Sequence, residues 1–260
     1  MIKRANTGHT AGSLSSVDIL NVLYNRIMGV TPANFDAVAR DHYIQSKGHS
    51  VEALYTVLAD AGFYSAAELD TFSSGGSHWV GHPTRKVPGV EHNTGALGHG
   101  LSVAVGLALG MKKDGLPHRV FTLLGDGELA EGSNWEASMT AAHYKLDNLT
   151  VIVDRNDLQI TGLTEEVMAL EPLVDKFRAF GYAVREVNGN DIPELVEALE
   201  GVPFVPGKPS LLLAHTVKGR GVSFIENVAS WHHHVPSDEE FRLALSELDQ
   251  AEAALNGAHR

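Results

Sequence analysis

Residues 123–158 read LLGDGELAEGSNWEASMTAAHYKLDNLTVIVDRNDL, and this stretch decides which fold to expect. The apolar run Val120–Leu124 ends in a Gly-Asp-Gly turn, and the apolar run Leu149–Val153 ends in Asp-Arg-Asn. Short apolar runs bounded by turn residues are typical of buried strands. Between them, Trp135–Leu146 can form a helix, which the capping-box pattern at Ser133 would begin. The stretch therefore predicts a right-handed strand–helix–strand unit.

Two oxygen-bearing side chains follow these strands directly. Asp126 comes after the first strand and Asn156 after the second, and open α/β sheets bind ligands at the carboxyl ends of parallel strands. These two side chains and the carbonyl of Leu158 are hard oxygen ligands suited to Mg²⁺, which is often shared with a diphosphate. Gly127 has no side chain, so its amide can approach a phosphate oxygen. A plain turn is the alternative, but the order strand–turn–helix–strand–Asn favours a ligand site.

The composition excludes several classes of protein. The 260 residues are 43% hydrophobic, which is enough for the core of one large or two small α/β domains. Cysteine is absent, which excludes disulfides and thiolate metal sites. A formal net charge of −12 argues against nucleic acid or an anionic membrane as a partner. Leu101–Met111 is too short an apolar run to span a bilayer, and the N-terminus lacks a signal-peptide pattern, so we expect a cytoplasmic protein.

The rest of the chain alternates helices and strands, without a repeat or a charged linker. Apolar spacing and capping residues predict helices at about 16–28, 50–61, 100–113, 172–180, 191–200 and 237–256, and strands at 182–187 and 210–214. This alternation predicts a single α/β domain over residues 1–260, with a parallel sheet that carries helices on both faces. In the helix at 100–113, Gly106 and Gly110 lie one turn apart, which indicates close packing of another element rather than a function.

Four of the 14 histidines follow a glycine: His9, His49, His82 and His99. The glycine leaves room for the ring to project from a loop, and histidine is the side chain that moves protons near neutral pH. One such residue is more often structural, but four in the same context favour a shared site. No pair of them has the spacing of a helical zinc site, and the run 232–234 suits at most a weak metal site.

The chain resembles the N-terminal part of transketolases over nearly its whole length. Residues 7–15 (TGHTAGSLS) and 46–49 (SKGH) resemble the family's SGHxGxxLS and SxGH segments. Residues 81–83 (GHP), 88–91 (PGVE) and 94–100 (TGALGHG) resemble GHP…PGVE…TGxLGQG. Residues 125–132 (GDGELAEG) with Asn156 resemble the thiamine diphosphate motif, and KGRG at 218–221, Glu226, Trp231 and His232 resemble the tail of free-standing N-terminal transketolase subunits.

The resemblance implies a thiamine diphosphate-binding fold and a transferase of carbohydrate metabolism. A two-carbon ketol unit would pass from a ketose phosphate to an aldose, on thiamine diphosphate held by Mg²⁺, for which Ca²⁺ can substitute. The implied metal ligands are Asp126, Asn156 and the carbonyl of Leu158. The implied cofactor-binding residues are His49, Gly95, Leu97, Gly127, Asn156 and His232.

The resemblance also implies catalytic roles. His9, His82 and His232 would face the oxygens of the donor sugar and assist proton transfer. Glu131, together with Glu136, would carry a carboxylate network towards a paired half-site, although a capping role for Glu136 is the alternative from the local pattern.

The chain departs from the family pattern in three ways. It ends where a fused transketolase continues, which implies a separate C-terminal subunit that carries the pyrimidine-binding domain and the glutamate that activates the aminopyrimidine. We therefore expect an α2β2 assembly in which this chain is inactive alone. His99 stands in place of a Gln, and His233 in place of the Gly after His232. The chain also begins a few residues before His9, where relatives have most of a helix.

Three other functions stay open at this point. One is another thiamine diphosphate enzyme, such as a 1-deoxyxylulose-phosphate synthase or the α subunit of a 2-oxo-acid dehydrogenase, although GDGELAEG and PGVEHNTGALGHG resemble transketolase more closely. A second is a non-catalytic cofactor-binding subunit, against which the intact set of histidines argues. A third is a dinucleotide-binding module, but the glycines at 95, 98 and 100 do not have the spacing G-x-G-x-x-G.

Overall fold

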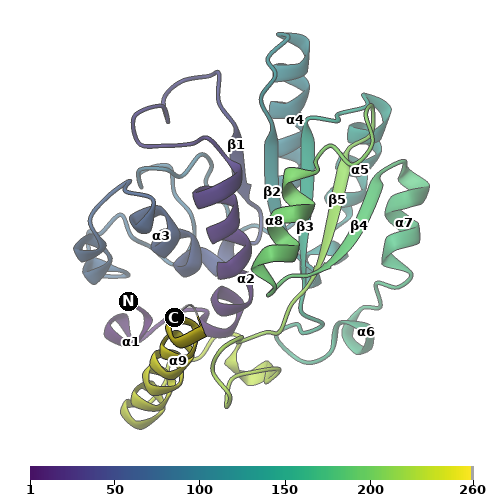
Figure 1. The fold of residues 1–260 in the computed structure, drawn as a ribbon. Coiled ribbons are helices and arrows are strands. Elements are labelled where there is room, and N and C mark those ends of the chain that lie inside the picture. The colour runs from purple at the N-terminus through teal and green to yellow at the C-terminus, as the bar shows by residue number, and fades with distance from the viewer. Residues whose placement is uncertain (259–260) are drawn as a thin grey trace.

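In the computed structural model, which describes residues 1–258, five strands form one sheet whose neighbours are all parallel (Figure 1). The strands are β1 (His42–Gln45), β2 (Val120–Gly125), β3 (Leu149–Arg155), β4 (Ala183–Asn188) and β5 (Ser210–His215). They lie in the order β1-β2-β3-β5-β4. The predicted α/β class is confirmed. The last two residues of the expected domain 1–260 lie outside the described part of the chain.

Helices cover both faces of this sheet (Figure 1). One hydrophobic cluster joins one face of the sheet to α2 (Thr10–Val22), α3 (Val51–Asp60) and α8 (Ile192–Glu200). A second cluster joins the opposite face to α4 (Gly100–Lys113), α5 (Gly132–His143) and α7 (Leu173–Phe180). The remaining helices are α1 (Ile2–Ala5), α6 (Thr164–Val167) and α9 (Asp238–Ala258). None of the helices within residues 1–258 has the length and apolar character needed to cross a membrane.

The central strands are buried on both faces, which explains their continuous apolar sequences. In β3, Ile152 belongs to the first cluster, whereas Val151 and Val153 on either side belong to the second. In β2, Leu123 and Leu124 divide in the same way. Successive side chains of a strand point to opposite faces, so a sheet covered on both sides requires apolar residues at every position.

β1 was not predicted, because its sequence His-Tyr-Ile-Gln is half polar. The strand is nevertheless buried, since Glu91 satisfies its polar groups. The Glu91 carboxylate accepts the N–H of Tyr43 and an N–H of Arg40, each at 2.8 Å, and it lies 2.5 Å from Nδ1 of His42. A residue about 50 positions along the chain therefore makes the burial of this polar strand possible.

The predicted capping box at Ser133 is wrong. α5 begins at Gly132, one turn earlier than expected, and Glu131 at its N-cap makes no side-chain cap bond. The Ser133 hydroxyl instead donates to the carbonyl of Gly98 at 2.7 Å. A tertiary acceptor has therefore taken the hydroxyl that the local pattern assigned to the helix end.

Other predicted helix ends are confirmed. Asp191 Oδ1 accepts the N–H of Glu194 at 3.0 Å at the start of α8. Ser237 Oγ accepts the N–H of Glu240 at 3.2 Å, and Glu240 Oε2 accepts the N–H of Ser237 at 2.7 Å, which completes a capping box before α9. Gly181 ends α7 with a left-handed φ of 107°.

Helix α2 is longer than the expected 16–28 at its start and changes geometry near its end. It begins at Thr10, so the motif at 7–15 opens into a helix rather than a loop. After Val22 the chain continues as a π-helix over Leu23–Ile27 and stops before Gly29. The N-terminal motif thereby places His9 at the N-cap of a helix.

The glycines of α4 have very different surroundings. A Cβ atom at Gly100 would lie 2.4 Å from Cβ of Ser46, whereas nothing lies within 4 Å of a Cβ atom at Gly106 or Gly110. The close packing that we expected at Gly106 and Gly110 is therefore not found within the described residues. It occurs instead at Gly100, where α4 begins beside the segment that follows β1.

We expect Gly100→Ala and Gly106→Ala to change stability in opposite directions. Gly100→Ala should lower the free energy of unfolding by about 1–3 kcal/mol, because the backbone near Ser46 must move. Gly106→Ala should raise it by about 0.5–1 kcal/mol, because alanine restricts the unfolded chain and meets no obstacle in the helix. Urea titration of both variants measures the difference. Equal effects at the two positions would contradict the packing described here.

Candidate functional site

A cavity of about 400 Å³ lies at the carboxyl edge of the sheet. Residues that follow four different strands line it: Lys47 after β1, Asp126 after β2, Asn156 after β3 and Lys218 after β5. This edge is where α/β sheets bind ligands, and the size is typical of a small-molecule site. The predicted site residues that line the cavity are His9, His49, His82, Gly95, Leu97, Asp126, Gly127, Asn156, Leu158 and His232.

Glu131 is the predicted catalytic residue that the structure does not bring to the cavity. It is exposed at the start of α5, and its Cβ lies 2.5 Å from where a Cβ atom of Gly98 would be. Glu136 is also exposed, one turn further along α5. A carboxylate network through these two residues therefore depends on a second chain and stays a prediction.

Asp126 is a buried carboxylate held by backbone amides. Its Oδ1 accepts the N–H of Gly127 at 2.8 Å, and its Oδ2 accepts the N–H of Asp157 at 2.7 Å. Burial, and then the nearby carboxylate of Asp154, raise the pKa of Asp126 to about 6. A carboxylate in this situation is stabilised by a cation placed beside it.

Two further oxygens accompany this carboxylate. Asn156 Oδ1 accepts the N–H of Leu158 at 3.2 Å, which turns the chain back towards the cavity. The carbonyl of Leu158 accepts a hydrogen bond from Nζ of Lys218 at 2.9 Å, so a cationic group already lies at this oxygen. Residues 1–258 contain no group of three or more His, Cys, Asp or Glu side chains that could hold a metal. A divalent cation held here would therefore take part of its oxygen ligands from a bound molecule.

Lys218 fixes the tautomer of His232. Nζ of Lys218 lies 3.1 Å from Nδ1 of His232, and an ammonium group can only donate. Nδ1 is therefore the acceptor, and Nε2 of His232 carries the proton. Burial, and then the charge of Lys218, lower the pKa of His232 to about 3, so this ring is neutral at pH 7.

Five histidine rings meet at the mouth of the cavity, with His9 at their centre. The centroid of the His9 ring lies 5.5 Å from that of His49, 6.0 Å from His82, 5.6 Å from His232 and 4.7 Å from His233. Burial, and then the neighbouring His233, lower the pKa of His9 to about 4. A neutral imidazole can accept a proton at one nitrogen and donate one from the other. The group is therefore suited to proton transfer at neutral pH.

His99, the fourth histidine that follows a glycine, does not join this group. It is exposed at the start of α4, and its Nδ1 lies 3.0 Å from the carbonyl of Leu97. The expectation of one shared site therefore holds for His9, His49 and His82, but not for His99.

Glu128 connects three segments of the cavity wall. Its buried carboxylate accepts the N–H of Gly98 at 2.8 Å, the N–H of Gly125 at 3.0 Å and the hydroxyl of Ser46. These donors belong to the three motifs SKGH, TGALGHG and GDG. One carboxylate thus sets the relative positions of backbone segments that are far apart in the sequence.

Several cavity residues had no role in the sequence-based interpretation. They are Lys47, Gly125, Glu128, Gln159, Ile160, Thr161 and Lys218. Lys47, Glu128 and Lys218 stand inside the motifs SKGH, GDGE and KGRG, so a charged residue within a ligand-binding motif was the available signal. Two buried nitrogens at the cavity, Nδ1 of His9 and Nε2 of Gln159, have no hydrogen-bond partner, and they remain available to a polar ligand.

Comparison with known proteins agrees with this geometry. Residues 1–249 match the family model described as transketolase, thiamine diphosphate binding domain. One of the two subunits of an apulose-4-phosphate transketolase, from Phocaeicola vulgatus, is 47% identical over 250 residues, which cover 96% of this chain and 89% of that protein. The 6-deoxy-6-sulfo-D-fructose transketolase subunit SqwG of a Clostridium species is 41% identical, with 96% and 91% covered.

Solved structures of transketolases have the same fold. The transketolase from Campylobacter jejuni superposes with a TM-score of 0.84 at 30% identity, over 99% of this chain and 45% of that chain. A transketolase from Pichia stipitis in complex with sedoheptulose 7-phosphate superposes with a TM-score of 0.88 at 29% identity, over 95% and 38%. The chain therefore corresponds to less than half of these longer proteins and to nearly all of the proteins named as subunits.

Proposed function

This chain belongs to the transketolase family, and we propose that it is the diphosphate-binding subunit of a split transketolase. With a separate pyrimidine-domain subunit, it transfers a two-carbon ketol unit from a ketose phosphate to an aldose. The observation that carries the proposal is the cavity at the carboxyl edge of the sheet, where the oxygen ligands and the histidines gather. The names of the relatives that match over 89% and 91% of their length, which describe separate transketolase subunits, support the split arrangement.

The residues of the cavity fit Mg²⁺ and thiamine diphosphate on their chemistry. Asp126, Asn156 and the carbonyl of Leu158 offer three hard oxygens to the metal. Lys47 and Lys218 place positive charge at the same edge of the sheet, where an anionic diphosphate would lie. The raised pKa of Asp126, about 6, is the property of a buried carboxylate that a bound cation would relieve.

Each class of residue has a defined task in this reaction. Bound thiamine diphosphate supplies the carbanion that attacks the ketose carbonyl. His232 would donate its Nε2 proton to an oxygen, because Lys218 fixes that tautomer. His9 and His82 would accept and return protons of the sugar hydroxyl groups as neutral bases within the same cluster. The remaining walls of the cavity orient the reactants and exclude water.

The proposal includes a partner subunit, in an α2β2 assembly. Apolar side chains are strongly exposed along the segment that follows the metal ligands, and this segment begins at the cavity itself. They are Ile160 (70% exposed), Leu163 (46%), Val167 (43%) and Met168 (58%). Large apolar side chains gathered at the rim of a site are typical of a protein interface. The exposed Glu131 and Glu136 would then face this partner.

The names of the relatives also support an anionic ketose as donor. One relative is named for apulose 4-phosphate and another for 6-deoxy-6-sulfo-D-fructose. Each of these sugars carries its anionic group away from the carbons that leave as the ketol unit. We propose a donor of the same class for this enzyme.

Reconstitution tests this function. The chain is purified from its native cell, and a co-eluting partner of about 300 residues, a plausible size for the missing domains, is identified. Ketol transfer from a ketose phosphate to an aldose is expected from the complex and not from the chain alone. Transfer by the isolated chain would contradict the split arrangement. Turnover of 2-oxo acids in place of ketose phosphates would instead identify another thiamine diphosphate enzyme.

A further inference from the structure

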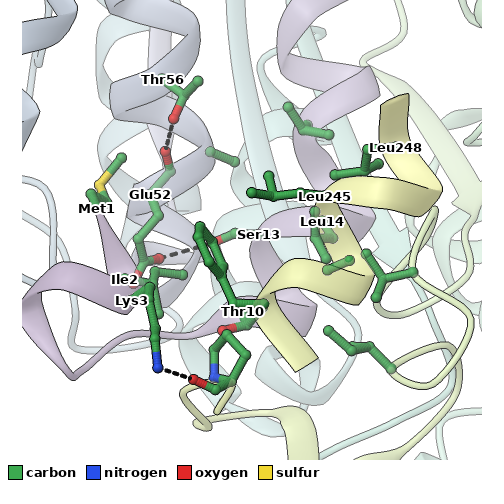
Figure 2. A pocket seen from close by; sticks show the side chains of 17 residues that line it. Met1, Ile2, Lys3, Thr10, Ser13, Leu14, Glu52, Thr56, Leu245 and Leu248 are labelled. Atoms are coloured by element: carbon green, nitrogen blue, oxygen red, sulfur yellow. Dashed lines mark hydrogen bonds between the residues drawn. The ribbon is translucent and has the colours of Figure 1, made fainter. Parts of the chain in front are cut away.

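Glu52 is a buried carboxylate that lies behind the histidine cluster and does not line the cofactor cavity. It belongs to the first turn of α3 and is 3% exposed. On its other side is an apolar groove of about 310 Å³, lined by side chains of α1, α2, α3 and α9. Figure 2 shows Glu52 in this groove, with its carboxylate directed towards Ser13 of α2. A charged group here is costly unless it is hydrogen-bonded.

Both carboxylate oxygens of Glu52 hold the beginning of α2. Oε1 accepts the backbone N–H of His9 at 2.9 Å, and Oε2 accepts the hydroxyl of Ser13 at 2.8 Å. His9 is the N-cap of α2 and makes no cap bond with its own side chain. The carboxylate of a different helix therefore takes the place of an N-cap side chain, at the end of α2 where a negative charge is favourable.

The backbone beside His9 leaves little room for another arrangement. Gly8 has a φ of 149°, and a Cβ atom on it would lie 2.7 Å from Oε1 of Glu52. The Nδ1 atom of the His9 ring is buried without a hydrogen-bond partner. The position of this ring therefore depends on its backbone anchor and on packing against neighbouring rings.

We propose that Glu52 is a positioning residue, which fixes His9 within the histidine cluster by holding its backbone amide and the first turn of α2. This inference rests on the proposed function, in which His9 assists proton transfer. Filling the groove requires only an apolar residue, whereas holding two donors requires the carboxylate. Because proton transfer depends on distances within hydrogen-bond reach, a shift of about 1 Å at His9 should lower turnover about 100-fold.

Three variants of the complete complex separate these contributions. Glu52→Leu keeps the apolar contact and removes both acceptors, so kcat should fall about 10- to 100-fold while the donor KM and the thiamine diphosphate Kd change less than about threefold. Glu52→Gln keeps an acceptor for His9 and a group for Ser13, so kcat should stay within about threefold. Thr56→Val is the matched control. Its hydroxyl donates to the Glu52 carbonyl in the same groove at 2.8 Å, and its loss should leave kcat unchanged (Figure 2).

A double-mutant cycle with His9→Ala shows whether Glu52 acts through His9. If it does, Glu52→Leu should lower kcat no further in the His9→Ala background. An additional tenfold loss there, or wild-type kcat in Glu52→Leu alone, would overturn this inference while leaving the proposed function intact. Wild-type kcat in His9→Ala would contradict the proposed role of His9 and this inference together. If Glu52→Leu does not fold, Glu52→Asp, which is too short to reach both donors, replaces it with an expected three- to tenfold loss of kcat.

Discussion

Replacing Asp126 with alanine is expected to weaken the binding of thiamine diphosphate in the presence of Mg²⁺ more than about 100-fold, since losing even an outer partner of a metal ligand costs 10- to 100-fold. Asp126 is the only carboxylate among the three proposed oxygen ligands, and Asn156 and the Leu158 carbonyl carry no charge. Without it, the divalent cation that joins the diphosphate to the protein loses its anionic ligand. Calorimetric titration of the cofactor, with and without the metal, measures the change.

Asp157→Ala is the matched control for this variant. Asp157 is the neighbour of Asn156, and its side chain is 61% exposed and pairs with Arg155 at 3.1 Å. An exposed pair contributes little, so cofactor affinity should change less than about threefold. The N–H that Asp157 donates to Asp126 belongs to the backbone and survives the substitution. Equal losses in the two variants would place the metal elsewhere.

The Asp126→Ala variant should still fold, which separates lost binding from lost structure. The folded-state pKa of about 6 is above the ordinary value, so the ionised carboxylate opposes folding at pH 7 when no cation is bound. Removing it relieves this opposition, while two backbone N–H groups lose their acceptor. These effects have opposite signs, and we expect the free energy of unfolding without metal to change by less than about 1 kcal/mol.

The residues at the strand ends were predictable because their signals are local. Asp126 and Asn156 each follow an apolar run by one or two positions, and parallel strands bring such positions to the same edge. The order of the family motifs then supplied roles for the histidines. Neither argument needs any knowledge of which distant residues touch.

The contacts that hold these residues in place were not predictable for the same reason. Lys47 and Asp154 are separated by 107 positions, and Glu52 and His9 by 43. The strand at 42–45 was missed because Glu91, about 50 positions away, is what allows it to be buried. Local periodicity and capping rules say nothing about such pairings. They explain where an element begins, but not which buried charge compensates which.

The ion pair between Lys47 and Asp154 is the strongest of these long-range contacts. Both side chains are buried, at 2% and 0% exposure. Asp154 lies in β3, and it also accepts the hydroxyl of Ser15 from α2 at 2.7 Å and that of Thr216, which follows β5. Lys47 follows β1 and also donates to the carbonyl of Gly12 in α2 at 2.9 Å. The pair therefore joins three strands and a helix at the edge that forms the cavity.

Lys47→Met is accordingly expected to lower the free energy of unfolding by about 3–5 kcal/mol at pH 7, because it leaves Asp154 buried without its cation. The control is Lys112→Met, which breaks a pair with Asp147 at 2.7 Å whose side chains are 38% and 32% exposed. That change should cost less than about 1 kcal/mol. Urea titration of both variants without cofactor measures stability alone. Similar losses in the two variants would show that the buried pair contributes no more than a surface pair.

The pH dependence distinguishes lost charge pairing from lost packing. Burial opposes ionisation, but the ammonium of Lys47 outweighs it and lowers the pKa of Asp154 below its ordinary value of about 4. In the wild type this contribution is complete above the ordinary value and is lost only as the pH falls below it. In Lys47→Met the desolvated carboxyl should have a raised pKa, so its ionised form opposes folding at pH 7, and protonation at lower pH relieves that opposition. The stability difference between the two proteins should therefore shrink between pH 7 and about pH 4.5. A constant difference over this range would assign the loss to packing around the lysine stem.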